Sequence, residues 1–375
     1  MKMSKKIKLG DTATFINGYA FKPADRGEVG LPIIRIQDLT GNAYDLGFYE
    51  GEYPEKIEIN DGDVLISWSA SLGVYVWNRG KALLNQHIFK VVFNKVDINK
   101  QYFVYAVKYK LAEMTSKTHG ATMKHIVKKD FDATEIPYPN MEQQKEITNI
   151  LNKAAFVVGT RKKEIQKLDD LIKARFIELF GDPAINSKGW KTKSLLDMGY
   201  CKNGMNFHTG DSGIEMHCLG VGDFKDLSII DGTESLSVIS LNEAPPEESM
   251  LRDGDIVFVR SNGNKALVGR CLVVYPHNTP TTYSGFCIRY RLTSSEVNTT
   301  YLLRVLKTDS MRKKMAGRGA NIQNLNQQIL ATLDIPLPPI EQQQQFANFV
   351  EQVDKSKVKK ITTTNIYCFT HMKSS

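Results

Sequence analysis

The chain has 375 residues, a length that suits two domains better than one. Its apolar content of 42% and charged content of 24% are ordinary for globular proteins and exclude a fibrous or disordered chain. The formal net charge of +8 favours a polyanionic partner such as nucleic acid, because phosphate contacts supply much of the affinity in such complexes.

The cysteines and the lack of long apolar runs indicate the compartment. The five cysteines are odd in number and have no C-x-x-C spacing, which argues against a disulfide framework and for a reducing environment: Cys201, Cys218, Cys271, Cys287 and Cys368. No apolar run approaches the ~20 residues that cross a bilayer, and the N-terminus has no apolar signal segment. We therefore expect a cytoplasmic protein that does not contact a membrane.

The first segment of the chain predicts turns that lead into strands and then a helix. Asp61-Gly62-Asp63 precedes the β-branched run 64–66, which is typical of a turn before a strand. A calcium loop is the alternative, but its spaced acidic ligands and closing glutamate are missing. The segment ends in Ile136-Pro137-Tyr138-Pro139, and such prolines are tolerated at helix starts.

Residues 142–180 predict one long helix. They contain no proline and one glycine, Gly159, and Gly181-Asp182-Pro183 follows as a stop signal. Apolar residues recur in alternating steps of four and three, at Ile147, Leu151, Ala154, Val158, Ile165, Leu168, Ile172 and Leu179, with Arg161 and Arg175 as interruptions. This pattern is a coiled-coil seam about 58 Å long at 1.5 Å per residue. A buried core helix is the alternative, but so narrow a stripe favours lengthwise pairing with another helix.

The same features then recur in the same order, which indicates an internal repeat. Asn17-Gly18 with Phe21 recurs as Asn203-Gly204 with Phe207, Asp61-Gly62-Asp63 as Asp253-Gly254-Asp255, Gly120-Ala121 as Gly319-Ala320, Ile136-Pro137-Tyr138-Pro139 as Ile335-Pro336-Leu337-Pro338, and Glu142-Gln143-Gln144 as Glu341-Gln342-Gln343. Chance recurrence of turn chemistry explains any single pair but not the ordered set.

The second copy of the long helix begins after residue 339. Phe346, Val350 and Val353 continue the seam, but Lys357, Lys360 and Thr364 then occupy seam positions. Residues 362–367 are rich in β-branched residues, which are poor helix formers. The sequence therefore predicts a second helix that pairs with the first and lacks its distal half.

This combination of motifs resembles the specificity subunits of type I restriction-modification systems. The resemblance rests on the Gly-Ala turns, the Ile-Pro-x-Pro segments, the Glu-Gln-Gln helix starts and the helix end Leu179-Phe180-Gly181-Asp182-Pro183. It implies an α+β fold in which a pair of long antiparallel coiled-coil helices separates two similar mixed α/β target recognition domains with pseudo-two-fold symmetry. The implied parts are a first recognition domain at 1–141, a central conserved spacer helix at 142–181, a second recognition domain at 182–340 and a shortened C-terminal conserved helix with its tail at 341–375.

The resemblance also implies a function. Each recognition domain would recognise one half of a bipartite site in double-stranded DNA, without catalysis by this chain. The helices would set the spacing and dock two methyltransferase subunits, in a complex that also contains motor-nuclease subunits. No cofactor is implied for this chain, since S-adenosylmethionine, ATP and Mg would bind the partner subunits. A shortened second helix would weaken docking but not DNA recognition.

Base recognition needs side-chain donors and acceptors on loops, such as Arg for guanine, Asn or Gln for adenine, and Ser or Thr for either. The first domain offers Arg35, Gln37, Ser67, Ser69, Ser71, His119, Thr122 and Lys124. The second offers Arg260, Ser261, Asn262, Asn264, Lys265, Arg318, Asn321, Gln323 and Asn324. Residues 260–265 are the sharpest candidates, because two cations and two amides directly follow a predicted strand; a solvated hairpin loop is the alternative.

Other cations suit the DNA backbone, where contacts position a protein without specifying sequence. These are Lys81, Lys128, Lys129, Arg270, Arg312, Lys313 and Lys314. An ordinary solvated surface explains each of them equally well.

The sequence lacks the motifs of common catalytic sites. It has no P-loop, no G-x-G-x-x-G, no H-E-x-x-H and no Asn-Pro-Pro-Tyr loop of an amino-methyltransferase. Cys201, His208, His217 and Cys218 match no familiar zinc spacing, and His87, His119 and His125 have no evident nucleophile partner. Two alternatives stay open: a nuclease or methyltransferase with degenerate motifs, and a repeat protein that binds other proteins.

Overall fold

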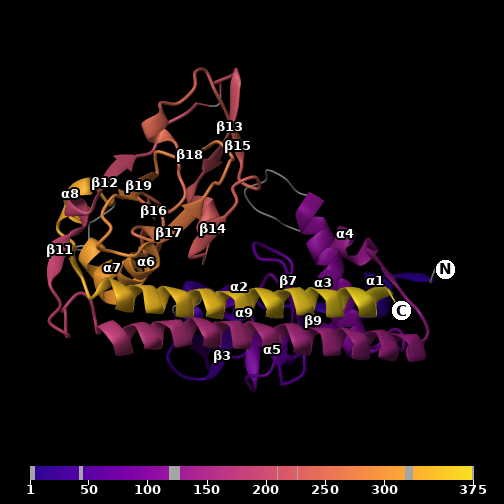
Figure 1. Ribbon diagram of the computed structural model, residues 1–375. Helices are drawn as coiled ribbons and strands as arrows, with labels where there is room; N and C mark the ends of the chain where they lie inside the picture. Colours follow the sequence, from indigo (N-terminus) through magenta and orange to yellow (C-terminus); the bar gives the residue numbers. More distant parts are fainter. Residues whose placement is uncertain are drawn as a thin grey trace. The chain divides into compact units, whose positions relative to one another are not determined.

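The computed structural model describes residues 5–41, 45–117, 127–208, 210–225, 227–316 and 324–373. The chain divides into two compact units (Figure 1). Unit 1 is Met1–Val158 with His371–Ser375, and unit 2 is Gly159–Thr370. Within the described residues, no helix combines the length and the apolar content that a membrane span requires.

Unit 1 contains two four-stranded sheets and one strand pair. The first sheet is antiparallel, in the order β2 (Thr14–Asn17), β9 (Ile88–Val92), β6 (Val64–Ser67) and β7 (Gly73–Val76). The second has the order β4 (Gly47–Tyr49), β3 (Leu31–Ile34), β8 (Ala82–Leu84) and β5 (Glu58–Ile59), with β3 and β8 parallel. β1 (Lys6–Lys8) pairs with β10 (Glu135–Pro137), and the shorter helices are α1 (Leu9–Thr12), α2 (Ile36–Thr40), α3 (Lys100–Lys117) and α4 (Lys128–Ala133).

Strand β6 has an apolar run, Val64-Leu65-Ile66, because both of its faces are buried. All four of its residues are buried, and successive side chains of a strand point to opposite faces. Val64 and Ile66 pack in one core with Phe103 of α3, whereas Leu65 packs in another with Leu83 of the second sheet. The strand therefore lies between two cores, and a polar residue on either face would lose apolar burial.

Unit 2 repeats this design. Its main sheet has the order β12 (Gly199–Asn203), β19 (Cys287–Leu292), β16 (Asp255–Val259), β17 (Cys271–Tyr275) and β14 (Ile229–Asp231). A second sheet has the order β15 (Val238–Leu241), β13 (Ile214–Leu219) and β18 (Thr281–Tyr283). β11 (Thr192–Ser194) pairs with β20 (Asp334–Pro336), and the shorter helices are α6 (Thr299–Lys307), α7 (Asp309–Ala316) and α8 (Gln327–Ala331).

The strand orders of the two units correspond. The order β2-β9-β6-β7 in unit 1 matches β12-β19-β16-β17 in unit 2, and β4-β3-β8 matches β15-β13-β18. The second sheet contains one parallel pair in each unit, β3 with β8 and β13 with β18. The prediction of two similar mixed domains is confirmed.

The repeated Glu-Gln-Gln motif ties the start of each long helix to its unit. The side chains of Gln144 and Gln343 are almost completely buried. The Oε1 atom of Gln144 accepts a hydrogen bond from the backbone of Asn99 (2.8 Å), and that of Gln343 accepts one from Asn298 (2.9 Å). Each Nε2 atom donates to the carbonyl of the proline five residues earlier (2.9 and 2.7 Å). A buried amide satisfied on both sides fixes the direction in which each helix leaves its domain.

The long helices are α5 (Met141–Phe180) and α9 (Ile340–Lys373). Within unit 2, the ring of Phe346 in α9 lies 5.6 Å from that of Phe176 in α5 and 5.5 Å from that of Phe180. Lys357 Nζ lies 2.6 Å from Asp169 Oδ1. Residue numbers therefore rise along α9 as they fall along α5, so these parts of the two helices pack antiparallel, as the family resemblance implies.

The prediction that the second helix lacks its distal half is wrong. α9 has 34 residues, against 40 in α5. A Thr residue costs only about 0.5 kcal/mol relative to Ala in a helix, and elongation avoids the unfavourable nucleation step once the first turns are packed. The residues from Ile340 to Lys373 include neither glycine nor proline to stop it. Lys357 is tolerated in the seam because it is paired with Asp169 and Asp354.

Candidate nucleic-acid interface

In unit 2, three segments distant in sequence meet at the end of strand β16. The backbone N–H groups of Arg260 and Ser261 both donate to the carbonyl of Phe286, at 2.8 and 3.3 Å. The N–H of Leu325 donates to the carbonyl of Arg260 (2.8 Å), and Ser261 forms a β-bridge with Asn324. We call residues 260–265, 284–286 and 324–325 the unit 2 rim. The structure thus brings Asn324 to the loop that the sequence favours most.

Asparagine side chains shape the 260–265 loop. The Oδ1 atom of Asn262 accepts from the N–H of Asn264 (2.8 Å), and that of Asn264 accepts from the N–H of Ala266 (3.0 Å). The second bond caps a short 3-10 helix, Lys265–Leu267. An amide oxygen has two lone pairs, so each can accept a further hydrogen bond from a base while it holds the loop.

The unit 2 rim contains an aromatic residue that the sequence analysis missed. Phe286 is 60% exposed, between the end of β18 and the start of β19. Arg260 lies beside it, with its guanidinium Nη1 atom donating to the carbonyl of Gly285 (3.2 Å). An exposed phenyl ring next to a cation suits contact with a base or with a thymine methyl group. The Ser284-Gly285 dipeptide before a strand was the available signal, because it is typical of a hairpin.

Unit 1 builds the equivalent rim with different side chains. We call residues 17–19, 67–71 and 85–87 the unit 1 rim. The N–H of Trp68 donates to the carbonyl of His87 (3.2 Å), which is the bond that Arg260 makes to Phe286 in unit 2. The rings of Trp68 and His87 meet edge to face at 4.9 Å. Asn17 accepts a hydrogen bond from Trp68 Nε1 at 3.3 Å.

Comparison with known proteins assigns the family. A family model described as "Type I restriction modification DNA specificity domain" matches residues 1–169 and 242–366. The chain belongs to this family. The prediction of a DNA-specificity subunit, rather than an enzyme, is confirmed at the level of the family.

The similarity of this chain to other specificity subunits covers most of its length. The Escherichia coli type I restriction enzyme EcoBI specificity subunit is 24% identical over 93% of this chain and 78% of the relative. The Salmonella potsdam StySPI specificity subunit is 26% identical over 86% of this chain and 75% of the relative. The crystal structure of a type I S subunit from M. genitalium has a TM-score of 0.50 and 14% identity, covering 98% of this chain and 95% of that one. This structural likeness supports the two-domain specificity fold.

The other residues that the sequence predicts to contact bases differ in how exposed their side chains are. Ser67 is fully buried and its hydroxyl donates to the carbonyl of Ser71, while Ser69 is 6% exposed. Only Ser71 of the three is exposed, so a base contact from Ser67 would require this turn to open. Arg35 is bound to Asp38 and to the carbonyl of Asp45, with only 12% of its side chain exposed.

Gln37, by contrast, is exposed on α2. The remaining predicted contacts lie outside the described residues: His119, Thr122, Lys124, Arg318, Asn321 and Gln323. The base-contact assignments therefore stay predictions, with Arg260, Ser261, Asn262, Asn264, Lys265 and Asn324 gathered in one rim.

The cations predicted for the DNA backbone also divide into groups. Lys129 and Lys313 are exposed, whereas Lys81 pairs with Glu58 (2.9 Å) and Lys128 with Asp132 (2.6 Å). The hydrogen bond from Lys81 lowers the pKa of Glu58 below its usual range. Lys314 donates to the carbonyl of Ala184 (2.7 Å), and Arg270 and Arg312 line a cavity described below.

Cys201 and Cys218 lie in surroundings that favour the neutral thiol. Burial raises the pKa of Cys201 and of Cys218 to about 12, so both thiols stay protonated at neutral pH. A zinc ligand or a nucleophile needs the thiolate. In the described part of the chain, no group of three or more metal-ligating side chains gathers, and His217 Nδ1 instead contacts the carbonyl of Leu236 at 3.1 Å.

Proposed function

We propose that each unit recognises one half of a bipartite DNA site through its rim. The observation that carries this proposal is the pair of rims, which share the N–H to carbonyl bond at the strand end and differ in their side chains. Trp68 and His87 occupy in unit 1 the positions that Arg260 and Phe286 occupy in unit 2. Two rims with the same backbone arrangement and different side chains suit two half-sites of different sequence.

Close backbone packing holds each rim in place. A Cβ atom on Gly18 would lie 2.0 Å from the carbonyl oxygen of Asn85, and one on Gly204 would lie 2.1 Å from that of Ser284. Only glycine permits these approaches. Rigid placement supports recognition, because side chains held by a fixed backbone lose less freedom when DNA binds.

Arg260 has the chemistry for a sequence-specific contact. A guanidinium has five N–H donors, and the bond to Gly285 uses one of them. Bidentate donation to guanine O6 and N7 is the commonest specific contact in the major groove. The net charge of +8 supports binding to the surrounding phosphates.

We extend the proposal to the partners of the chain. We infer that α5 and α9 set the half-site spacing and dock two methyltransferase subunits, and that motor-nuclease subunits join the complex in the cytoplasm. Relatives named as specificity subunits of type I restriction enzymes support this, as does a neighbouring structure that concerns assembly of the type I R-M system (TM-score 0.50). S-adenosylmethionine, ATP and Mg would then be bound by the partners.

The experiment that tests recognition replaces Arg260 or Asn262 with alanine in the assembled complex. Selection from random duplexes should show relaxed preference in one half-site, with a loss of about 1–3 kcal/mol per contact. Trp68→Ala should relax the other half-site only. Equal loss on every sequence from all three variants would refute base recognition by the rims, because a backbone contact weakens binding uniformly.

A second experiment tests the spacer helix. Gly159 lies within α5, and a Cβ atom there would meet nothing within 4 Å. Gly159→Pro should break the helix, at a cost of about 3 kcal/mol or more, and abolish tight binding to the split site while each half-site remains recognised. Gly159→Ala is the matched control and should strengthen the helix by about 1 kcal/mol. Unchanged affinity of the proline variant rejects the spacer role.

A further inference from the structure

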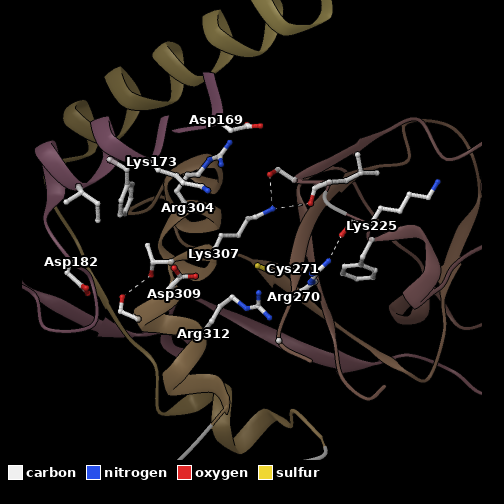
Figure 2. Close-up of a pocket in the computed structure, with 18 of the residues that line it drawn as sticks. Asp169, Lys173, Asp182, Lys225, Arg270, Cys271, Arg304, Lys307, Asp309 and Arg312 are labelled. Carbon is white, nitrogen blue, oxygen red and sulfur yellow. Dashed lines mark hydrogen bonds between the residues drawn. The ribbon is translucent and has the colours of Figure 1, made fainter. Parts of the chain in front are cut away.

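Unit 2 contains a cavity that DNA recognition does not explain. Its volume is about 620 Å³, within the range of roughly 300–1,000 Å³ that small-molecule sites occupy. Its walls come from the last part of α5, from α6 and α7, and from the segments around Phe224 and Cys271 (Figure 2). All of these belong to unit 2.

Cations dominate the lining of this cavity. Six basic residues line it, against the three carboxylates of Asp169, Asp182 and Asp309; the basic residues are Lys173, Lys225, Arg270, Arg304, Lys307 and Arg312. Figure 2 shows that Lys225 directs its ammonium away. Arg270, Lys307 and Arg312 lie around Cys271, and Arg304 lies beside Lys173 on the side of Asp169, so basic side chains outnumber carboxylates along the cavity.

Within the described residues, Arg304, Lys307 and Arg312 are held mainly by neutral groups or by burial rather than by a direct ion pair. Lys307 Nζ donates to the carbonyl of Leu227 (3.1 Å) and to the hydroxyl of Ser228 (2.8 Å). Arg312 donates to the carbonyl of Ala266 (2.9 Å). Among the described residues, neither of these two cations nor Arg304 forms an ion pair with a carboxylate. Asp169 of α5, which also lines the cavity, forms its ion pair with Lys357 at 2.6 Å.

Arg304 is the clearest sign of a missing ligand. Its Nε atom is buried and has no hydrogen-bond partner among the described residues. Burial lowers the pKa of Arg304 and of Lys307 below their usual values, because the charged forms are partly desolvated. Asp354 and Asp169 attract Arg304, but desolvation of its charge is the larger effect, and an anion in the cavity would offset that cost.

The rest of the lining fits an organic group beside the anion. Phe176, Ile177, Phe224 and Leu227 add apolar surface to the cavity. Guanidinium groups match phosphate oxygens in a bidentate geometry, and lysine supplies a point charge. We propose that this cavity binds a phosphate group of a nucleotide-sized ligand, held by Arg304, Lys307 and Arg312.

This site is independent of the proposed DNA half-site recognition. The phosphate can come from a free nucleotide or from the DNA backbone, and the partly enclosed space favours the free ligand. The two sources differ in one measurable way: a free nucleotide binds without DNA, whereas a backbone phosphate binds only as part of a duplex.

The test measures binding of inorganic pyrophosphate, ATP and a short random duplex to the purified full chain by calorimetry. We expect saturable one-to-one binding of pyrophosphate or ATP, and at least a tenfold loss in Arg304→Gln and in Lys307→Gln, since a charge-assisted hydrogen bond contributes about that factor. Lys313→Gln is the matched control: it removes one exposed charge from α7, the helix that carries Arg312, at a residue outside the cavity lining. Its affinity should be unchanged.

Arg312→Gln distinguishes a loss of binding from misfolding. Arg312 is only half-buried, so the fold should tolerate the change. The variant should also lose pyrophosphate or ATP binding while it retains the wild-type unfolding midpoint. If the wild type binds only the duplex, and Arg304→Gln weakens that binding while Lys313→Gln does not, the phosphate is that of the DNA backbone. No binding of any probe, or equal losses in Lys313→Gln and the cavity variants, overturns the proposal.

Discussion

The two rims show how one backbone design carries two different recognition surfaces. In unit 1 the strand end places Trp68 against His87, and in unit 2 it places Arg260 against Phe286, through the same N–H to carbonyl bond. The glycine that lets the neighbouring segment approach is also repeated, as Gly18 and Gly204. Backbone hydrogen bonds therefore fix the shape of the rim, and the side chains are free to differ because they do not make those bonds.

The aspartates at the starts of the β6 and β16 segments also differ in their surroundings. Asp255 in β16 is 1% exposed and accepts two hydrogen bonds from Arg291, at 2.8 and 2.7 Å. The corresponding Asp63 is 26% exposed and lies 3.2 Å from Lys90. Both aspartates accept from a backbone N–H three residues earlier, so the turn is common to both units, whereas the basic partner is Arg291 in unit 2 and Lys90 in unit 1.

The largest expected effect is a loss of stability in one unit while the other unit keeps its stability. In Gly204→Ala the new Cβ would overlap the carbonyl of Ser284, which belongs to the backbone and cannot rotate away. Unit 2 should lose about 3 kcal/mol or more, by overpacking, and Gly18→Ala should do the same to unit 1. Hydrogen exchange resolved by peptide measures each unit separately. Gly263→Ala, with nothing within 4 Å, is the control and should change little; equal losses in both units from one variant would show that the units do not unfold separately.

The second expected effect compares the stability that Asp255 and Asp63 contribute to their units. Asp255→Asn leaves Arg291 without its counter-charge in a buried site, so unit 2 should lose about 3 kcal/mol. Asp63→Asn in the more exposed turn should cost unit 1 about 1 kcal/mol or less. Urea unfolding followed by peptide-resolved exchange gives both values. Equal losses of unfolding free energy from the two substitutions would contradict this difference between the units.

A smaller effect concerns recognition alone. Phe286→Ala removes an exposed ring, so stability should change by no more than about 0.5 kcal/mol. Binding should weaken by about 1–2 kcal/mol, since a phenyl group buried against DNA contributes about that much. The loss should fall within one half-site, and His87→Ala should act on the other. Binding assays on duplexes with a single altered half-site measure this, and a loss spread evenly over both half-sites would contradict it.

The last effect is absent at neutral pH and appears only under alkaline conditions. Burial raises the pKa of Cys218 and of Cys287 to about 12 and that of Cys271 to about 11, from an ordinary value of 9.0. Between those values only the unfolded state ionises, so unit 2 should lose stability as pH rises above 9. Residues 1–158 contain no cysteine, so unit 1 should lose less. Unfolding midpoints at pH 8 and pH 10.5 check this, and Cys218→Ala should reduce the difference.

Some repeated residues were visible in the sequence and were not recognised. Asn99 and Asn298 each cap the following helix through Oδ1, and the hydroxyls of Tyr102 and Tyr301 each donate to a proline carbonyl at 2.9 Å. Both pairs have the pattern Asn-x-x-Tyr and the same offset as Gln144 and Gln343. Periodicity does not reveal them, because an isolated pair of polar residues has none. The role of each tyrosine is evident only from the proline carbonyl that accepts its hydrogen bond.

Local patterns were enough to predict the repeat, the turns before β6 and β16 and the seam of α5, since turn chemistry and periodicity depend on neighbouring residues. The combination of motifs added the resemblance to the family. Long-range packing was needed to show that Ser67 is buried, that Phe286 lies beside Arg260, that α9 continues to Lys373 and that six basic residues line one cavity. Each of these depends on segments far apart in the chain. Their proximity is set by sheet pairing and core packing, which no local pattern specifies.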